Sequence, residues 1–133
     1  MKILINMDVP ELGPAIEFYR SALGLHVARV IDDDVAELTD GSSVFYLLQK
    51  PAGSSPVTDR AEVRQYARHW TPVHIDFVVD NVEEAAKRAV SAGARQESNC
   101  VEWMGSKCIT LSDPFGHGFC VIEFTGTTYS DGA

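Results

Sequence analysis

The segment that decides the fold is TPVHIDFVVDNVEEAAKRAVSAGA, residues 71–94. Residues 73–79 are mostly apolar and rich in β-branched side chains, with His74 and Asp76 between them, which predicts a strand. Asn81 is followed three residues later by Glu84, a pattern typical of a helix start, and apolar residues then recur at helical spacing. The segment therefore predicts a strand that leads directly into a helix.

The same order of elements occurs in the first half of the chain. Residues 2–7 predict a strand, and the stretch DVPELGPAIEFYRSALGL at 8–25 predicts a helix with its prolines near the first turn. Further strands are predicted at 26–31, 35–38 and 44–50 in the first half, and at 107–111 and 118–124 in the second.

The two halves also align residue by residue. Val9 falls on Val79 at an offset of 70, and near the end of each half Gln49 falls on Glu123 at an offset of 74. A repeated strand–helix–strands pattern indicates an internal duplication. We therefore predict an α+β fold of two paired modules, each with a strand, a helix and further strands.

A chain of 133 residues favours a single domain, residues 1–133. Neither module can bury both faces of its sheet, so we expect the modules to pair into a curved mixed sheet around a cleft, with the helices outside. The expected parts are a first module at 1–50, a linker or lid at 51–72, a second module at 73–126 and a tail at 127–133.

Composition limits the partners. The net charge of −8, without a stripe of basic residues, argues against nucleic acid and favours a cationic small molecule weakly. No apolar run reaches the roughly 20 residues that span a membrane, and no signal-peptide pattern is present, so we expect a cytoplasmic protein without a membrane partner. Three cysteines without CxxC spacing argue against a disulfide framework and a zinc knuckle.

Three stretches together resemble one family. VPELGPAIEFYRSALGL, HIDFVVDNVEEAAKRAVSAGA and LSDPFGHGFCVIEF, in this order and spacing, resemble the vicinal oxygen chelate superfamily of glyoxalase I, bleomycin and fosfomycin resistance proteins and extradiol dioxygenases. The resemblance implies paired βαβββ modules, a homodimer and a small-molecule cleft inside the curved sheet.

Metal-using members of that superfamily carry ligands at four equivalent strand positions. The resemblance places these positions at Leu4, Tyr46, His74 and Cys120. Leucine cannot ligate, whereas a stable divalent site needs three or four N, O or S donors. We therefore expect the usual metal to be missing and no cofactor to be required.

A nonstandard divalent metal site is the alternative. Its candidate donors are His69, His74, His117 and Glu123, with His74 and Glu123 foremost. Strand alternation weighs against Glu123, because Cys120 and Glu123 are three residues apart and should face opposite sides of their strand.

The same alternation selects residues for the cleft. His74 and Asp76 share one face of their strand and are the candidate catalytic pair, either as a general base with its partner or as polar lining. The tryptophans lie in segments that either cover a ligand, cover a sheet edge or join a dimer interface. The predicted ligand-binding residues are Asn6, Asp8, Tyr46, Trp70, His74, Trp103 and Cys120.

Three functions remain open on this evidence. The preferred one is a small-molecule binding protein of glyoxalase/bleomycin-resistance type that works without the usual catalytic metal. The second is an enzyme, a glyoxalase-like lyase, an isomerase or an extradiol-type dioxygenase, that acts through a rebuilt metal site or through His74. The third is a dimeric domain whose cleft has degenerated. Fold does not choose among them, because this fold supports all three.

Overall fold

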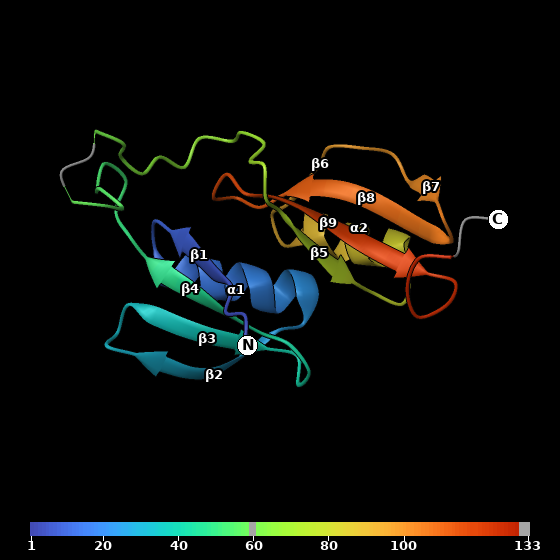
Figure 1. Ribbon diagram of the computed structural model, residues 1–133, viewed down its shortest axis with the longest axis horizontal. Helices are drawn as coiled ribbons and strands as arrows, with labels where there is room; N and C mark the ends of the chain where they lie inside the picture. The colour runs from blue at the N-terminus through green and yellow to red at the C-terminus, as the bar shows by residue number, and fades with distance from the viewer. Residues whose placement is uncertain (59–60, 131–133) are drawn as a thin grey trace. The chain divides into compact units, whose positions relative to one another are not determined.

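The computed structural model describes residues 1–58 and 61–130. The chain forms two compact units, residues 1–67 and residues 68–133, each with its own sheet and helix (Figure 1). Within the described residues, no helix combines the length and the apolar content needed to cross a membrane.

The first unit is a four-stranded mixed sheet with one helix. Its strands follow the order β1-β4-β3-β2, with β1 parallel to β4 and the other neighbours antiparallel. The elements are β1 (Asn6–Val9), α1 (Leu12–Leu23), β2 (His26–Ile31), β3 (Val35–Thr39) and β4 (Val44–Gln49).

Helix α1 packs its apolar side on this sheet. Pro14 lies in its first turn, where a missing N–H costs nothing, and Gly24 ends it with a left-handed φ of 71°. Tyr19 is fully buried, and its hydroxyl donates to the sulfur of Met7 at 3.4 Å. The core consists of Met7, Val9, Ala15, Phe18, Tyr19, Ala22, Ala36, Leu38, Phe45 and Leu47.

The second unit repeats the plan. Its strands follow the order β5-β9-β8-β6, with β5 parallel to β9 and β7 paired to β8 beyond the end of β6. The elements are β5 (Ile75–Val78), α2 (Val82–Ser91), β6 (Arg95–Gln96), β7 (Val101–Trp103), β8 (Ser106–Ser112) and β9 (Gly118–Phe124).

Helix α2 begins where the sequence predicts. The side chain of Asn81 accepts a hydrogen bond from the N–H of Glu84 at 3.0 Å, which satisfies one of the free donors of the first turn. Phe119 is fully buried and meets Phe77 edge to face, with ring centroids 5.7 Å apart. The core under α2 consists of Val82, Ala86, Ala89, Ile109, Leu111, Phe119 and Val121.

The predicted α+β class with two βαβββ modules is confirmed. The pair Asn6 and Tyr46 in β1 and β4 corresponds to the pair Asp76 and Cys120 in β5 and β9, at the two offsets found in the sequence. In the second unit, β6 and β7 share the place of one strand, which the sequence pattern did not reveal. The cleft around which the modules should pair stays a prediction.

The first strand lies further along the chain than predicted. It covers Asn6–Val9 and not residues 2–7, and both Ile3 and Ile5 are exposed. The reason is register, because β1 pairs with β4 from Asn6 onwards and only the carbonyl of Ile5 is added, accepting from Tyr46.

The described part of residues 51–72 contains no helix. Instead, Arg64 exchanges backbone hydrogen bonds with Gly53 and Ser54, and its guanidinium pairs with Asp8 at 2.7 Å. The predicted linker at 51–72 and the predicted tail at 127–133 extend beyond the described residues, which omit 59–60 and 131–133.

Candidate functional site

Three potential donors meet on the second unit. His74 lies directly before β5, Asp76 lies in β5, and Cys120 lies opposite Asp76 in β9. One ligand atom from each lies within 4.8 Å of the others, and His74 Nε2 is 3.1 Å from Asp76 Oδ1. The structure thus brings the predicted catalytic pair and Cys120 into one group.

This group lies on the face of the sheet opposite α2, which we call the helix-free face. Side chains at paired positions of neighbouring strands point to the same side, so register identifies the members of this face. By the pairing of β5, β9 and β8 they are Asp76, Cys108, Thr110, Gly118, Cys120 and Ile122.

Trp70 covers one end of the helix-free face. Its indole ring lies 4.9 Å from the imidazole of His74, measured between ring centroids. A Cβ atom on Gly118 would lie only 2.3 Å from the Trp70 ring, so the indole rests directly on the backbone of β9. Trp70 therefore needs glycine at this position, which explains why β9 begins with one.

Arg68 also lies against this tryptophan. Its guanidinium carbon lies 5.2 Å from the centre of the Trp70 ring, a cation–π distance, and the same guanidinium binds both carboxylate oxygens of Glu97 at 2.7 and 2.5 Å. The hydrogen bond from Arg68 lowers the pKa of Glu97 and in turn raises the pKa of Arg68. The bidentate pair therefore anchors Trp70.

The thiol of Cys120 is the buried member of the donor group. It is 5% exposed, and burial raises its pKa above the ordinary value. Thr110 Oγ1 lies 3.5 Å from Cys120 Sγ. By contrast, the side chains of His74 and Asp76 are about one third exposed (34% and 35%) and can meet a ligand from solvent.

Three predicted ligand residues belong to the first unit. Asn6, Asp8 and Tyr46 share the sheet face opposite α1, as their register requires. Asp8 is already paired with Arg64 at 2.7 Å, and the hydroxyl of Tyr46 donates to Glu37 at 2.8 Å. This hydrogen bond raises the pKa of Tyr46 and lowers that of Glu37.

Trp103 lies at the other end of the second sheet from Trp70. Trp103 pairs with Ser106 of β8, and Ser106 pairs with Phe124 of β9. Phe124 is four residues along β9 from Cys120, so the two Cα atoms are about 13 Å apart at roughly 3.3 Å per residue. Its ring packs on Tyr129, with centroids 5.4 Å apart. Trp103 does not join Trp70 at the donor group.

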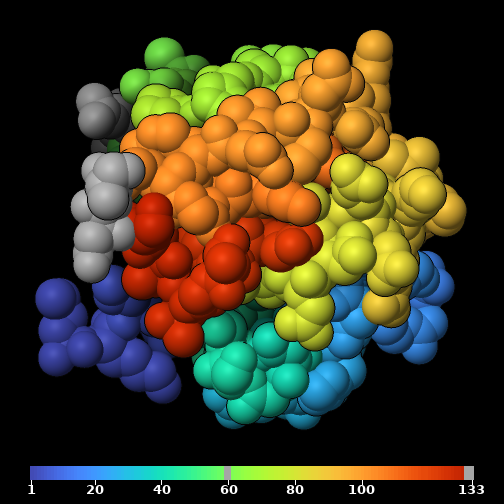
Figure 2. All heavy atoms as spheres, turned by 90° about the vertical axis from the view of Figure 1, so that its right-hand side faces the viewer, coloured from blue at the N-terminus to red at the C-terminus, as the bar shows by residue number. Residues whose placement is uncertain are grey.

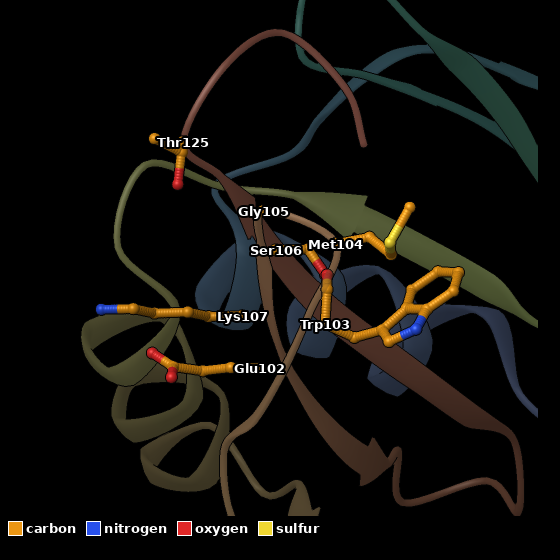
Figure 3. Close-up of a pocket in the computed structure, with 7 residues that line it drawn as sticks. All are labelled: Glu102, Trp103, Met104, Gly105, Ser106, Lys107 and Thr125. Carbon is orange, nitrogen blue, oxygen red and sulfur yellow. The ribbon is translucent and has the colours of Figure 1, made fainter. Parts of the chain in front are cut away.

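The surroundings of Trp103 form a separate hollow. In Figure 2 the orange surface of β7 and β8 adjoins the red surface of β9 and the residues after it. Here the N–H of Ser130 donates to the carbonyl of Met104. Figure 3 shows Glu102 and Lys107 pointing away from Trp103. The hollow has a volume of about 320 Å³ and is lined by Glu102, Trp103, Met104, Gly105, Ser106, Lys107 and Thr125.

Glu123, predicted as a donor for a nonstandard metal site with His74, faces the helix side instead. Its carboxylate accepts a hydrogen bond from the N–H of Val82 at 2.9 Å, at the start of α2. His117 is also engaged elsewhere, with Nδ1 2.7 Å from the buried carboxylate of Asp113. The group that could hold a metal therefore contains Asp76 and Cys120 in place of Glu123 and His117.

The residues only partly fit the metal that the family resemblance implies. At the four equivalent positions, Leu4 is an exposed apolar residue outside β1, and Tyr46 already bonds Glu37. Imidazole, carboxylate and thiol from one unit form a mixed N, O and S set, which suits Zn²⁺ better than a hard ion held by oxygens alone.

Sequence reasoning missed Arg68, Glu97 and Cys108 as neighbours of this site. Arg68 and Glu97 are 29 residues apart and lie in segments without periodicity, so no local signal links them. One local signal was available: Gly118 at the start of a predicted strand is a residue type that often marks a place where another group, here the Trp70 ring, packs directly on the backbone.

Comparison with known proteins adds a family model. The model described as a glyoxalase-like domain matches residues 4–122. The anthracycline biosynthesis protein DauV from Streptomyces sp. (strain C5) is 30% identical over 120 residues, which make up 90% of this chain and 40% of that protein. The chain thus spans about two fifths of the length of this curated relative.

Solved structures of low sequence identity share the fold. A glyoxalase-related enzyme from Fulvimarina pelagi matches with a TM-score of 0.71 at 14% identity, over 98% of this chain and 95% of that one. The fosfomycin resistance protein FosX from Listeria monocytogenes matches with a TM-score of 0.68 at 15% identity, over 94% of this chain and 93% of that one.

Proposed function

Because the chain belongs to the glyoxalase-like domain family, we propose that it binds a flat aromatic small molecule on the helix-free face of the second unit. One observation carries this proposal. The ring of Trp70 lies 4.9 Å from the ring of His74, measured between centroids, and His74 Nε2 lies 3.1 Å from Asp76 Oδ1. An aromatic surface next to a few convergent polar groups is the usual make-up of a small-molecule site.

The chemistry of the site supports an aromatic ligand. Trp70 is 49% exposed, and its ring packs against the backbone of Gly118. Because the ring is already held in place, binding a ligand on it costs little side-chain entropy. His74 and Asp76 can donate to or accept from a hydroxyl or carbonyl at the rim of such a ligand. The curated relative acts in anthracycline biosynthesis, and anthracyclines are flat aromatic molecules with such rims.

Isothermal titration calorimetry with a water-soluble anthracycline tests this proposal. We expect saturable binding that weakens about tenfold in Trp70→Ala, equivalent to about 1.4 kcal/mol of lost stacking and burial. Trp103→Ala is the matched control, because Trp103 lies at the far end of the sheet, and it should keep the affinity. Absence of saturable binding, or an equal loss of affinity in both variants, would refute the proposal.

A second candidate function is enzymatic, and the donor group favours it. His74, Asp76 and Cys120 could hold a divalent ion that polarises a carbonyl of the bound molecule, as a lyase, isomerase or dioxygenase of this family type requires. Alternatively, His74 oriented by Asp76 at 3.1 Å takes a proton from the substrate as a general base. Turnover that disappears in His74→Ala while the aromatic probe still binds would favour this function.

The proposal includes a cytoplasmic homodimer. Contiguous exposed apolar residues at Ile3, Leu4 and Ile5 support self-association, because such a run is costly to leave in water. Light scattering on the purified protein should give twice the chain mass, and Leu4→Asp should reduce it to the mass of one chain. Cell fractionation tests the location.

A further inference from the structure

Asp76 is the acidic residue among those that register assigns to the helix-free face. The other members of this set carry a thiol, a hydroxyl or an isoleucine side chain or, at Gly118, no side chain. On the neighbouring strand Cys120 and Ile122 are 5% and 3% exposed, whereas the side chain of Asp76 is 35% exposed. The face therefore presents an accessible carboxylate in surroundings of low polarity.

Arg68 also reaches this face, but its charge is already balanced. A terminal nitrogen of Arg68 lies 2.8 Å from the position that a Cβ atom on Gly118 would take. Both carboxylate oxygens of Glu97 bind this guanidinium, at 2.7 and 2.5 Å. Because Arg68 and Glu97 form a neutral pair, Arg68 does not balance the charge of Asp76.

His74 does not supply a permanent positive charge either. Its Nε2 atom lies 3.1 Å from Asp76 Oδ1, and the imidazole is cationic only when it is protonated. A neutral imidazole can donate a hydrogen bond to the carboxylate, but it leaves the negative charge in place. The low-polarity surroundings screen this charge less than water does, so a cation brought by a ligand is attracted to Asp76.

The position of Trp70 indicates where the ligand would carry this cation. The ring of His74 lies 4.9 Å from the ring of Trp70, measured between centroids, and its Nε2 atom contacts Asp76. His74 and Asp76 are two residues apart in an extended segment, so their Cα atoms are separated by about 7 Å. A ring system packed on Trp70 can therefore reach Asp76 with a short arm that passes His74.

We propose that Asp76 determines the class of ligand by binding a protonated amine, so that the site selects cationic flat aromatic molecules over neutral ones. The ammonium group donates a charge-assisted hydrogen bond to the carboxylate while the rings of the ligand pack on Trp70. This inference rests on the proposed aromatic site and adds the charge that its ligand carries. Asp76 is then a specificity-determining residue.

Two probes that share one ring system test this inference. The first is a water-soluble anthracycline with a free amine, and the second is the same molecule with that amine acetylated and therefore uncharged. Isothermal titration calorimetry on the wild-type protein should show about tenfold tighter binding of the free amine, because hydrogen bonds between charged groups are the stronger ones. Asp76→Asn keeps the shape of the side chain, and it should remove this preference by weakening only the binding of the free amine.

Glu102→Gln is the matched control. It also removes one negative charge from the protein, but Glu102 pairs with Lys107, which is next to Cys108 in β8 and so faces the other side of the sheet. The preference for the free amine should therefore stay at about tenfold in this variant. Circular dichroism spectra establish that both variants are folded.

The possible results separate this inference from the proposed function. Equal affinity of the two probes in the wild-type protein would overturn the inference alone, and this result requires no variant to fold. A preference that persists in folded Asp76→Asn would also overturn it, because the bulk of the acetyl group would then explain the difference. An equal loss in Glu102→Gln would assign the preference to the net charge of the protein. If neither probe binds, the proposed function fails and the inference fails with it.

Discussion

The carboxylate of Glu123 accepts a hydrogen bond from the backbone N–H of Val82, so the last strand of the second unit holds the first residue of its helix. Gln49 does the same in the first unit, where its side-chain oxygen accepts from the N–H of Leu12 at 2.8 Å. Each contact satisfies a donor that the helix itself cannot satisfy. The duplicated residues therefore have a structural role in both units.

Replacement of Glu123 should separate hydrogen bonding from charge. Glu123→Ala should lower the free energy of unfolding by about 1 kcal/mol, the usual cost of losing a side chain that satisfies the first turn of a helix. Glu123→Gln should cost less, because Gln49 shows that an amide oxygen serves the same purpose. Urea unfolding curves measure both variants, and equal losses would contradict this explanation.

Gly118→Ala should displace Trp70. The new methyl group would lie 2.3 Å from the indole, so the ring must leave its position, while the backbone at Gly118 tolerates alanine. We expect a changed Trp70 fluorescence in a Trp103→Phe background and loss of aromatic binding comparable to Trp70→Ala. Gly126→Ala is the control, because nothing lies within 4 Å of its Cβ position. Unchanged fluorescence in Gly118→Ala would refute the contact.

Acid should release the Arg68–Glu97 pair. The pKa of Glu97 is lowered from 4.5 by its hydrogen bond with Arg68, so the pair stabilises the fold above pH 4.5 and loses this contribution as the pH falls through the lowered pKa. Because Arg68 lies against Trp70, the Trp70 fluorescence of the Trp103→Phe protein should change in this acid range. Glu97→Gln should show the changed signal already at neutral pH and lose the acid step.

Asp113 should be important for the stability of the turn between β8 and β9. Its buried carboxylate accepts from the N–H groups of Phe115 and His117, both at 2.9 Å, and contacts the His117 ring. Asp113→Ala should cost about 2–3 kcal/mol, because it leaves these donors unsatisfied. Asp113→Asn should cost less, since one oxygen remains. Thermal unfolding by circular dichroism measures both, and a loss below about 0.5 kcal/mol in Asp113→Ala would contradict this role.

Much of each unit was predictable from local pattern. The N-cap at Asn81 and the strand His26–Ile31 follow from neighbours in the sequence, and the structure has them as predicted. Strand alternation also placed His74 and Asp76 on one face, because side chains two residues apart share a side of a strand. The first strand was misplaced, since the register of β1 with β4 begins at Asn6 and, before it, only the carbonyl of Ile5 accepts a hydrogen bond, from Tyr46.

The sequence by itself determined the strand–helix–strands plan, its duplication and which residues of one strand share a side of the sheet. Only the tertiary structure decided which residues touch: Trp70 on Gly118, Arg68 with Glu97, and Thr110 beside Cys120. The physical reason is that helix caps and strand alternation depend on residues a few positions apart. Cross-strand neighbours instead depend on register, which the packing of a whole sheet against its helix selects.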